Sequence, residues 1–271
     1  YLLIKTPGIN SFSKFIYKIT MKKKFKKVNA AILIIGNEIL SGRTQDLNVS
    51  FISNWLNDSC GIKVEEVRVI SDNEKIIIKT INELRKKFNY VFTTGGIGPT
   101  HDDITAESIS KAFKVKYEYH KEAFTILEKY YGKIKFNDGR KKMSKMPRGS
   151  RLIYNPSSAA PGFKIDNVFC LPGVPLILRS MIHNCLKYLK RGSKLYSTSI
   201  NLITVESNIA KGLAKIQKKY KKEIDIGSYP FFRLGRIGVS IVLRSQNKHK
   251  INLCKKEILK DIVKKKMIKK V

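Results

Sequence analysis

The sequence predicts an α/β protein: a three-layer, mostly parallel sheet with helices on both faces, followed by a small C-terminal α+β domain. Three observations support this prediction. Short apolar runs alternate with amphipathic, helix-like stretches through the first half of the chain. The 271 residues, 42% of them hydrophobic, are enough for one full core and a smaller second one. A short glycine-containing stretch at 192–194 separates the two patterns.

The first domain, residues 29–191, is predicted to begin with three strand–helix pairs. Apolar runs predict buried strands at 29–35 and 90–94, and a further strand is predicted at 61–70 through Val64, Val67, Val69 and Ile70. Apolar residues at helical spacing predict helices at 49–56, 74–88 and 106–113. Asp46 or Asn48 can cap the first of these helices. This alternation favours a parallel sheet.

The remaining elements follow the same criteria. A polar helical insertion, two strands and a helix are predicted at 120–146, 151–154, 167–171 and 175–190. The second domain, residues 195–271, is predicted to hold strands at 197–204, 223–227 and 238–243, a helix at 206–220 and an amphipathic C-terminal helix. Residues 1–28 lack a starting Met, and Met21 precedes three lysines. We expect this extension to be disordered or a non-native start.

Composition excludes some classes of protein. The net charge is +33, but only 11 of the 54 basic residues are Arg, whereas nucleic-acid surfaces favour Arg. Specific nucleic-acid binding is therefore not expected. No apolar run reaches the roughly 18 residues that span a bilayer, so no membrane partner is expected. The four cysteines lack CxxC spacing, which predicts buried thiols in a cytoplasmic protein without disulfides or a zinc site.

The segment TTGGIGPTHDDIT, residues 93–105, carries the strongest functional signal. It joins a predicted strand to a predicted helix, and its glycines let backbone N–H groups approach an anion. Asp102 and Asp103 would repel a phosphate unless a divalent metal bridges them or they accept a hydrogen bond from the ligand. Asp103 could instead only cap the helix. Two acids, a threonine and three glycines together favour a ligand site.

Other polar segments are predicted to converge on the same place, because ligands bind beyond the carboxyl ends of strands in an open α/β sheet. Asp102 and Asp103 are the predicted catalytic residues and metal ligands. Arg43 can fork onto a phosphate. The predicted ligand-binding residues are Glu38, Ser41, Gly42, Arg43, Asp72, Thr94, Gly95, Gly96, Gly98, Thr100, Thr105, Asn155, Pro172, Gly173 and Val174.

Five ordered blocks also carry a family resemblance. They are IGNEILSGRT, GGIGPTHDDITAES, NP with AAPGF, LPGVP and GSYPFF, within residues 30–262. Together they resemble the MoaB/Mog molybdopterin-binding fold, in the form found in the N-terminal part of competence/damage-inducible protein A (CinA). The resemblance implies a MoaB/Mog-like first domain and a KH-like second domain. It also implies that Asp72 and Asp103, with the neighbouring Asp102, hold the ligand. Asn37 stands where the family usually has Asp, so one potential metal ligand is missing.

The resemblance leaves three functions open. The first is metal-dependent hydrolysis of the pyrophosphate bond of ADP-ribose or a similar nucleoside-diphosphate compound, with Mg²⁺ or a similar divalent ion. The second is a non-hydrolytic pterin-binding protein of the molybdenum cofactor pathway, with molybdopterin as ligand. The third is RNA binding by the basic KH-like domain, although its GxxG turn is missing at 207–210. The LPGVP and GSYPFF blocks favour the first, an enzyme with a small-molecule ligand that forms a homodimer.

Overall fold

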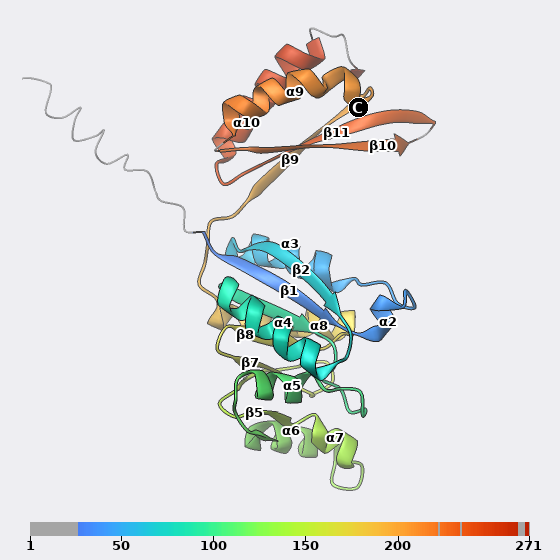
Figure 1. The fold of residues 1–271 in the computed structure, drawn as a ribbon, viewed down its shortest axis with the longest axis vertical. Helices are drawn as coiled ribbons and strands as arrows, with labels where there is room; N and C mark the ends of the chain where they lie inside the picture. The colour runs from blue at the N-terminus through green and yellow to red at the C-terminus, as the bar shows by residue number, and fades with distance from the viewer. Residues whose placement is uncertain (1–26, 222, 234, 265–268, 271) are drawn as a thin grey trace, which may run out of the picture.

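The computed structural model of the chain describes residues 27–221, 223–233, 235–264 and 269–270. Two domains follow one another along the longest axis of the molecule (Figure 1). Residues 1–26 of the predicted N-terminal extension lie outside the described residues. Val28 belongs to the first core instead, because its side chain is buried and its carbonyl accepts a hydrogen bond from the N–H of Lys63.

The first domain is built on a six-stranded sheet in the order β2-β1-β3-β8-β7-β6. The strands are β1 (Asn29–Ile35), β2 (Lys63–Ile70), β3 (Tyr90–Thr94), β6 (Arg151–Ile153), β7 (Gly162–Ile165) and β8 (Val168–Leu171). The pairs β2–β1, β1–β3 and β3–β8 are parallel. Strand β7 is antiparallel to both of its neighbours, so β6 runs parallel to β8. The predicted mostly parallel sheet is confirmed, and β7, with only four residues, was missed.

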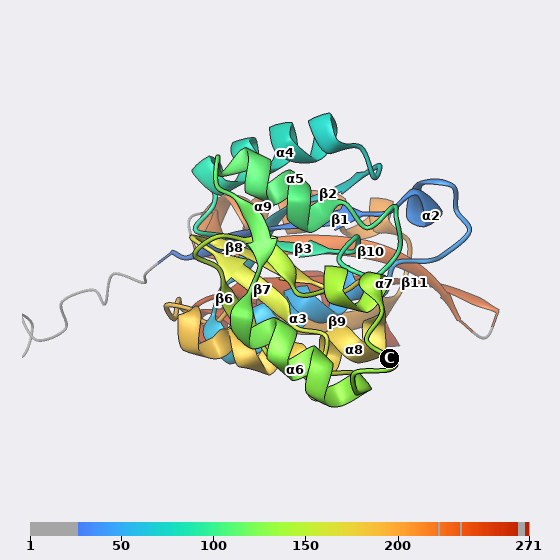
Figure 2. The same cartoon turned by 90° about the horizontal axis from the view of Figure 1, so that it is seen from below.

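Helices cover both faces of this sheet, as predicted (Figure 2). Helices α4 (Glu74–Lys87) and α5 (Thr105–Ala112) cover one face, while α3 (Asn48–Cys60) and α8 (Pro175–Met181) cover the other. From Ala30 to Ile35, successive residues of β1 alternate between the two cores, which makes this part of the strand apolar on both faces. No helix among the described residues is long and apolar enough to cross a membrane.

Two predicted helices are divided in the structure. The 120–146 insertion forms α6 (Lys121–Tyr131) and α7 (Asp138–Lys142), flanked by a small antiparallel sheet of β4 (Tyr117–Tyr119) and β5 (Lys145–Pro147). Gly132, with φ 72°, ends α6, and the side chain of Asn137 caps α7. The helix predicted at 175–190 is α8 followed by a 3-10 turn, η1 (Ile182–Tyr188).

The second domain has a sheet in the order β10-β11-β9-β12. Its elements are β9 (Tyr196–Ile203), α9 (Glu206–Tyr220), β10 (Asp225–Arg233), β11 (Arg236–Ser245), α10 (Lys248–Ile258), the π-helical turn η2 (Leu259–Lys264) and β12 (Lys269–Lys270). Both helices lie on the side of the sheet that faces away from the first domain (Figure 1). Strands β10 and β11 are longer than predicted because they pair as a hairpin up to Arg233 and Arg236. Pro230 is tolerated there because β10 is an edge strand.

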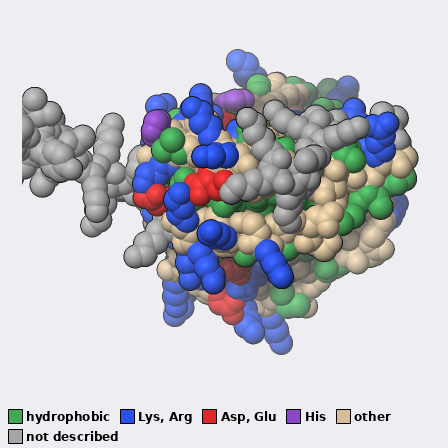
Figure 3. Space-filling view, turned by 90° about the horizontal axis from the view of Figure 1, so that it is seen from above, with side chains coloured by type: hydrophobic (Ala, Val, Ile, Leu, Met, Phe, Trp, Pro, Cys, Tyr) green, Lys and Arg blue, Asp and Glu red, His purple; other side chains and the backbone are tan. Residues whose placement is uncertain are grey.

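Two composition-based predictions have structural counterparts. All four cysteines are free and buried, as predicted. Burial raises the pKa of the Cys170 thiol to about 12, so this thiol is inert near neutral pH. Lysine and arginine side chains are scattered around the outer face of the second domain (Figure 3). The expectation that the chain does not bind nucleic acid specifically stays a prediction.

Candidate active site

The parallel strands of the first domain end level with one another and create a common rim. Thr94 pairs with both Ile34 and Leu171, and Ile35 pairs with Ile70. The loops after β1, β2, β3 and β8 therefore leave the sheet at one edge, and the loop after β6 joins them because β6 is parallel to β8. These loops hold the predicted site residues. The structure thus brings together five segments that are up to 136 residues apart, from Glu38 to Val174.

We call residues 95–104, between β3 and α5, the glycine loop. It has no space for a side chain at Gly95 or Gly96. Gly95 and Gly96 have φ values of 98° and 65°, in the left-handed region. A Cβ on Gly95 would lie 2.1 Å from the carbonyl oxygen of Ile35, and one on Gly96 would lie 2.1 Å from Oγ1 of Thr105. The N–H of Thr105 also donates to the carbonyl of Gly96, at 3.0 Å. The loop is thereby held across the end of β1 and against the start of α5.

Asp103 closes the second half of this loop. Its Oδ2 accepts hydrogen bonds from the backbone N–H of Thr100, at 2.8 Å, and from the Thr100 hydroxyl, at 2.5 Å. The N-cap of α5 is Ile104, without a side-chain cap, so the interpretation of Asp103 as a helix cap is wrong. A Cβ on Gly98 would lie 2.7 Å from Oδ2 of Asp103. The carboxylate is therefore seated in the loop by Thr100 and Gly98.

Asp102 is the exposed member of the acid pair. The nearby Thr100 hydroxyl, whose proton Asp103 accepts, also lowers the pKa of Asp102, and the backbone N–H of Asp102 and the positive charges of His101 and Lys142 lower it further. This carboxylate stays ionised well below neutral pH. The loop thus presents one partly buried carboxylate and one exposed carboxylate at the rim.

Asp72 links the first two rim loops. Its Oδ2 accepts a hydrogen bond, at 2.8 Å, from the backbone N–H of Asn37, which is 35 residues away in sequence. Asn37 begins α2 (Asn37–Leu40), a single turn that also carries Glu38. Asp72 thereby positions the segment that presents Glu38. A direct ligand contact by either acid stays a prediction.

The end of α2 places the one arginine of the predicted site. The backbone N–H of Ser41 donates to the carbonyl of Asn37, at 2.9 Å, and its hydroxyl donates to the carbonyl of Glu38, at 3.3 Å. Gly42 follows with φ 71°. Arg43 is exposed and has no ion-pair partner within the described part of the chain. Its guanidinium is free to reach an anion at the rim.

Asn155 organises its own loop. Its Oδ1 accepts from the N–H groups of Ser157 and Ser158, at 2.9 and 3.1 Å. Its Nδ2 donates to Oγ of Ser158 and to the carbonyl of Ala160, at 2.7 and 2.9 Å. Both amide atoms of Asn155 therefore bind groups of its own loop and stabilise that loop. A ligand contact by Asn155 stays a prediction. Pro172, Gly173 and Val174 form the neighbouring turn between β8 and α8, where they lie at or near the surface.

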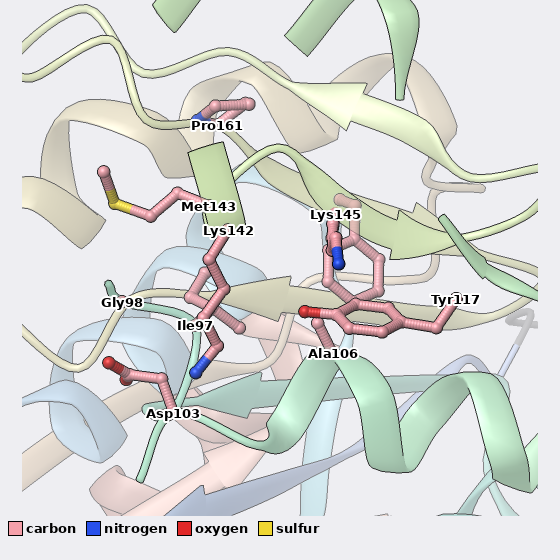
Figure 4. Close-up of a pocket in the computed structure, with 10 residues that line it drawn as sticks. Ile97, Gly98, Asp103, Ala106, Tyr117, Lys142, Met143, Lys145 and Pro161 are labelled. Carbon is pink, nitrogen blue, oxygen red and sulfur yellow. The ribbon is translucent and has the colours of Figure 1, made fainter. Parts of the chain in front are cut away.

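Sequence reasoning missed a set of residues from the 120–146 insertion and its flank. They line a cleft beside the glycine loop together with Asp103 (Figure 4). The cleft is lined by Ile97, Gly98, Asp103, Ala106, Tyr117, Lys142, Met143, Lys145, Pro161 and Phe163. The ammonium of Lys142 donates to the carbonyl of Thr100 and lies toward the Asp103 end of the cleft. Lysine abundance marks the insertion, but it does not indicate which lysine returns to the rim.

The cleft is positively charged overall. Lys142 and Lys145 supply two ammonium groups, against the single carboxylate of Asp103. Burial, with nearby negative charges including Asp103, raises the pKa of Tyr117 to about 12. The phenol therefore stays a hydrogen-bond donor at physiological pH. A phosphate group beside the glycine loop would meet two cations and one hydroxyl donor here.

Comparisons with known proteins identify the family. Residues 31–191, more than half of the chain, match the family model described as a probable molybdopterin binding domain. The chain belongs to this family. Residues 194–271 match the model described as the FAD synthase middle domain. The two matches meet at the 192–194 linker.

Individual relatives refine this placement. The crystal structure of CinA from Thermoplasma acidophilum, described as a protein with unknown function, is 32% identical; the match covers 60% of this chain and 98% of that chain, with a TM-score of 0.56. A protein of Archaeoglobus fulgidus is 33% identical over 199 residues, 73% of this chain and 84% of the relative. One from Sulfurisphaera tokodaii is 36% identical over 202 residues, 70% and 76% of the two chains. The protein is thus a CinA-like member of the MoaB/Mog fold family.

Proposed function

We propose that this CinA-like protein hydrolyses the pyrophosphate bond of ADP-ribose or a similar nucleoside-diphosphate compound. The observation that supports this most is the arrangement around the glycine loop. Two carboxylates, Asp102 and Asp103, lie on the same turn as backbone N–H groups, and two lysines line the adjacent cleft. Beside a phosphate, these acids are repelled unless a divalent metal bridges them or they accept a hydrogen bond from another part of the ligand. Acids and cations together suit a diphosphate that is both bound and attacked.

The cations of this site would hold the diphosphate. Lys142 and Lys145 line the cleft on one side of the glycine loop, and Arg43 is free on the loop after α2. Charge-assisted hydrogen bonds to phosphate are about twice as strong as neutral ones. The loop N–H groups and these side chains would fix the diphosphate over Asp102 and Asp103.

The acids fit a divalent metal that is shared with the ligand. Among the described residues no group of three or more His, Cys, Asp or Glu side chains can enclose a metal ion. Mg²⁺ is commonly held by one or two carboxylates and the phosphates of its substrate, which Asp102 and Asp103 can provide. A bound divalent ion would supply Lewis-acid stabilisation of the charge on the diphosphate. The hydrogen bonds from Thr100 keep the Asp103 carboxylate in place for this role.

A screen of the purified protein tests the proposal. ADP-ribose, FAD, NAD and dinucleoside polyphosphates would be incubated with several divalent ions, and the products would be separated by chromatography. We expect cleavage of at least one diphosphate, its loss with EDTA and its return with an added divalent ion. Full activity in EDTA would contradict the metal role and assign Asp102 and Asp103 to direct ligand contacts. No cleavage of any compound would contradict hydrolysis.

A pterin-binding protein without hydrolytic activity is the second candidate. The description of the family model, a probable molybdopterin binding domain, favours it. In this case Asp72 and Asp103 would orient the cofactor. A pterin that binds tightly, with no diphosphate cleaved, would support this candidate against the first. The predicted homodimer, measurable by light scattering, stays a prediction under both.

A further inference from the structure

A second pocket lies on the other side of the glycine loop from the lysine cleft. Its wall includes Thr94 and Gly95, whereas the lysine cleft begins at Ile97 and Gly98. We call it the Asn48 pocket. It is lined by Ile34, Ile35, Glu38, Ile39, Thr44, Gln45, Asp46, Leu47, Asn48, Thr94, Gly95, Gly173 and Pro175. The two cavities therefore share the glycine loop but are lined by different residues of it.

Asn48 leaves one buried hydrogen-bond acceptor without a partner. The residue is only 4% exposed and lies at the start of α3. Its Nδ2 donates to the carbonyl of Gly173, at 2.8 Å, while Oδ1 is buried without a hydrogen-bond partner. A carbonyl can only accept, so the amide nitrogen must face Gly173 and the oxygen must be the free atom. Buried polar atoms without partners are rare and require an explanation.

The pocket is chemically unlike the lysine cleft. Its lining residues include no Lys, Arg or His. The carboxylate of Asp46 accepts from the N–H of Val49, at 2.9 Å, and so serves the start of α3. Glu38 has no ion-pair partner in the part of the chain that the structure describes. Such a lining repels phosphate and offers acceptors to an N–H donor.

The apolar side chains restrict the shape of the guest. Ile34, Ile39, Leu47 and Pro175 contribute hydrocarbon walls. Gly95 has no side chain, and a Cβ on Gly173 would lie 3.4 Å from the Cα of Gly95. No side chain therefore covers the backbone at these two positions of the pocket wall. Flat heterocycles with N–H groups combine both requirements, an apolar face and a donor edge.

We propose that the Asn48 pocket binds the heterocycle of the ligand and that Oδ1 of Asn48 accepts a hydrogen bond from its amino or ring N–H group. The phosphates of the same ligand lie across the glycine loop, toward Lys142. The exocyclic amine of adenine and the amino-lactam edge of a pterin both supply this donor. The inference rests on the proposed ligand site at the rim. It does not depend on hydrolysis, because it concerns binding alone.

A double-mutant-type cycle, with one substitution in the protein and one change in the ligand, tests the proposal. ADP and purine riboside 5′-diphosphate, which lacks the amine, would be titrated calorimetrically into the wild-type protein and into Asn48→Ala. A net hydrogen bond of the usual strength predicts that the wild-type protein prefers ADP by about 2- to 12-fold. We expect Asn48→Ala to remove that preference. The amide contact to Gly173 is lost for both ligands and cancels in the comparison.

A matched control separates recognition from structure. Asn57 lies on the same helix, and both of its amide atoms have partners. Its Nδ2 donates to the carbonyl of Leu195, at 3.0 Å, and its Oδ1 accepts from the N–H of Leu195, at 2.9 Å. Asn57→Ala should keep the ADP preference. An equal loss for both diphosphates in Asn48→Ala, with the preference intact, would exclude adenine as the ring that Asn48 contacts. If Asn48→Ala does not fold, the wild-type comparison still decides, since equal affinity for the two diphosphates is incompatible with a contact to the adenine amine.

A titration with a pterin shows which ring supplies the N–H donor to Asn48. Neopterin would be titrated into the same variants. Loss of neopterin binding in Asn48→Ala, but not in Asn57→Ala, would support the proposal with a pterin as the guest, even where ADP shows no preference. If neither ring depends on Asn48, the proposal is refuted, whatever the outcome of the hydrolysis screen.

Discussion

Asp103→Asn is the sharpest test of the proposed chemistry, because its effects on folding and on turnover can be calculated separately. The carboxylate accepts two hydrogen bonds from Thr100. An asparagine oxygen can accept both, but without the charge. Charged hydrogen bonds are worth about 1.5–3 kcal/mol and neutral ones about 1 kcal/mol, so the half-buried loop should lose about 1 kcal/mol of unfolding free energy. The melting temperature should fall by only about 2–4 °C.

Turnover should respond far more strongly. If the Asp103 carboxylate shares a divalent ion with the diphosphate, removal of its charge should lower kcat/KM by about 10²-fold or more, equivalent to about 2.7 kcal/mol. The assay is hydrolysis of the best diphosphate from the screen at saturating divalent ion. Thermal melts of the same samples measure folding. A variant that folds normally and hydrolyses like the parent would refute the mechanism and reduce Asp103 to a loop-closing residue.

Asp166→Asn is the matched control. Asp166 also lies in a turn, between β7 and β8, at the opposite end of the strands from the rim. It has φ 48°, a conformation that asparagine adopts readily. The same chemical change should therefore leave both folding and turnover close to those of the parent. A large loss of turnover here would show that net charge, and not position, controls activity.

Two further predictions concern the lysine cleft. Lys142→Gln should raise KM about tenfold with a smaller change in kcat, because a cation that holds the diphosphate acts on substrate binding. The control Lys141→Gln should change neither constant, since Lys141 pairs with Asp138 at 3.2 Å. Equal kinetics for the two variants would remove Lys142 from the site. Burial raises the pKa of Tyr117 to about 12, so its contribution to stability is present below its ordinary pKa near 10 and is lost as pH rises from about 10 toward 12. Unfolding measurements across that range should show the wild-type protein losing stability relative to Tyr117→Phe as pH rises; a constant difference between the two would contradict the assignment.

The rim was predictable from the sequence because its cause is local. Strands β1 and β3 are apolar runs and β2 alternates apolar with charged residues, and each ends before a glycine or a polar residue, at Gly36, Gly95 and Ser71. Parallel pairing then aligns these ends without any further information. The same logic placed the second domain, whose helices have clear apolar faces. Strand β7 escaped because Gly162 and Lys164 interrupt its apolar residues, whereas the equally short β8 is a continuous apolar run.

The contacts that complete the site were not predictable, because they join segments distant in sequence. Lys142 reaches the carbonyl of Thr100 across 42 residues, and Asn48 reaches Gly173 across 125. Asp72 was predicted to hold the ligand, but the sequence did not show that its Oδ2 accepts a hydrogen bond from the backbone N–H of Asn37 at the start of α2. A sequence pattern predicts which side chain lies at the site, but not which distant residue it hydrogen-bonds. The same holds for the insertion, whose polar composition predicted a solvated helix although its end lines the cleft.

Charge and specificity have different sources in this protein. With a net charge of +33, the chain attracts polyanions of many kinds at low salt, and that attraction identifies none of them. Discrimination needs groups that respond to one chemistry and reject another. The Asn48 pocket has this property, since its lining lacks cations and holds one unpaired acceptor. The lysine cleft and the glycine loop would hold any diphosphate, so the identity of the ligand should depend on the ring that Asn48 accepts.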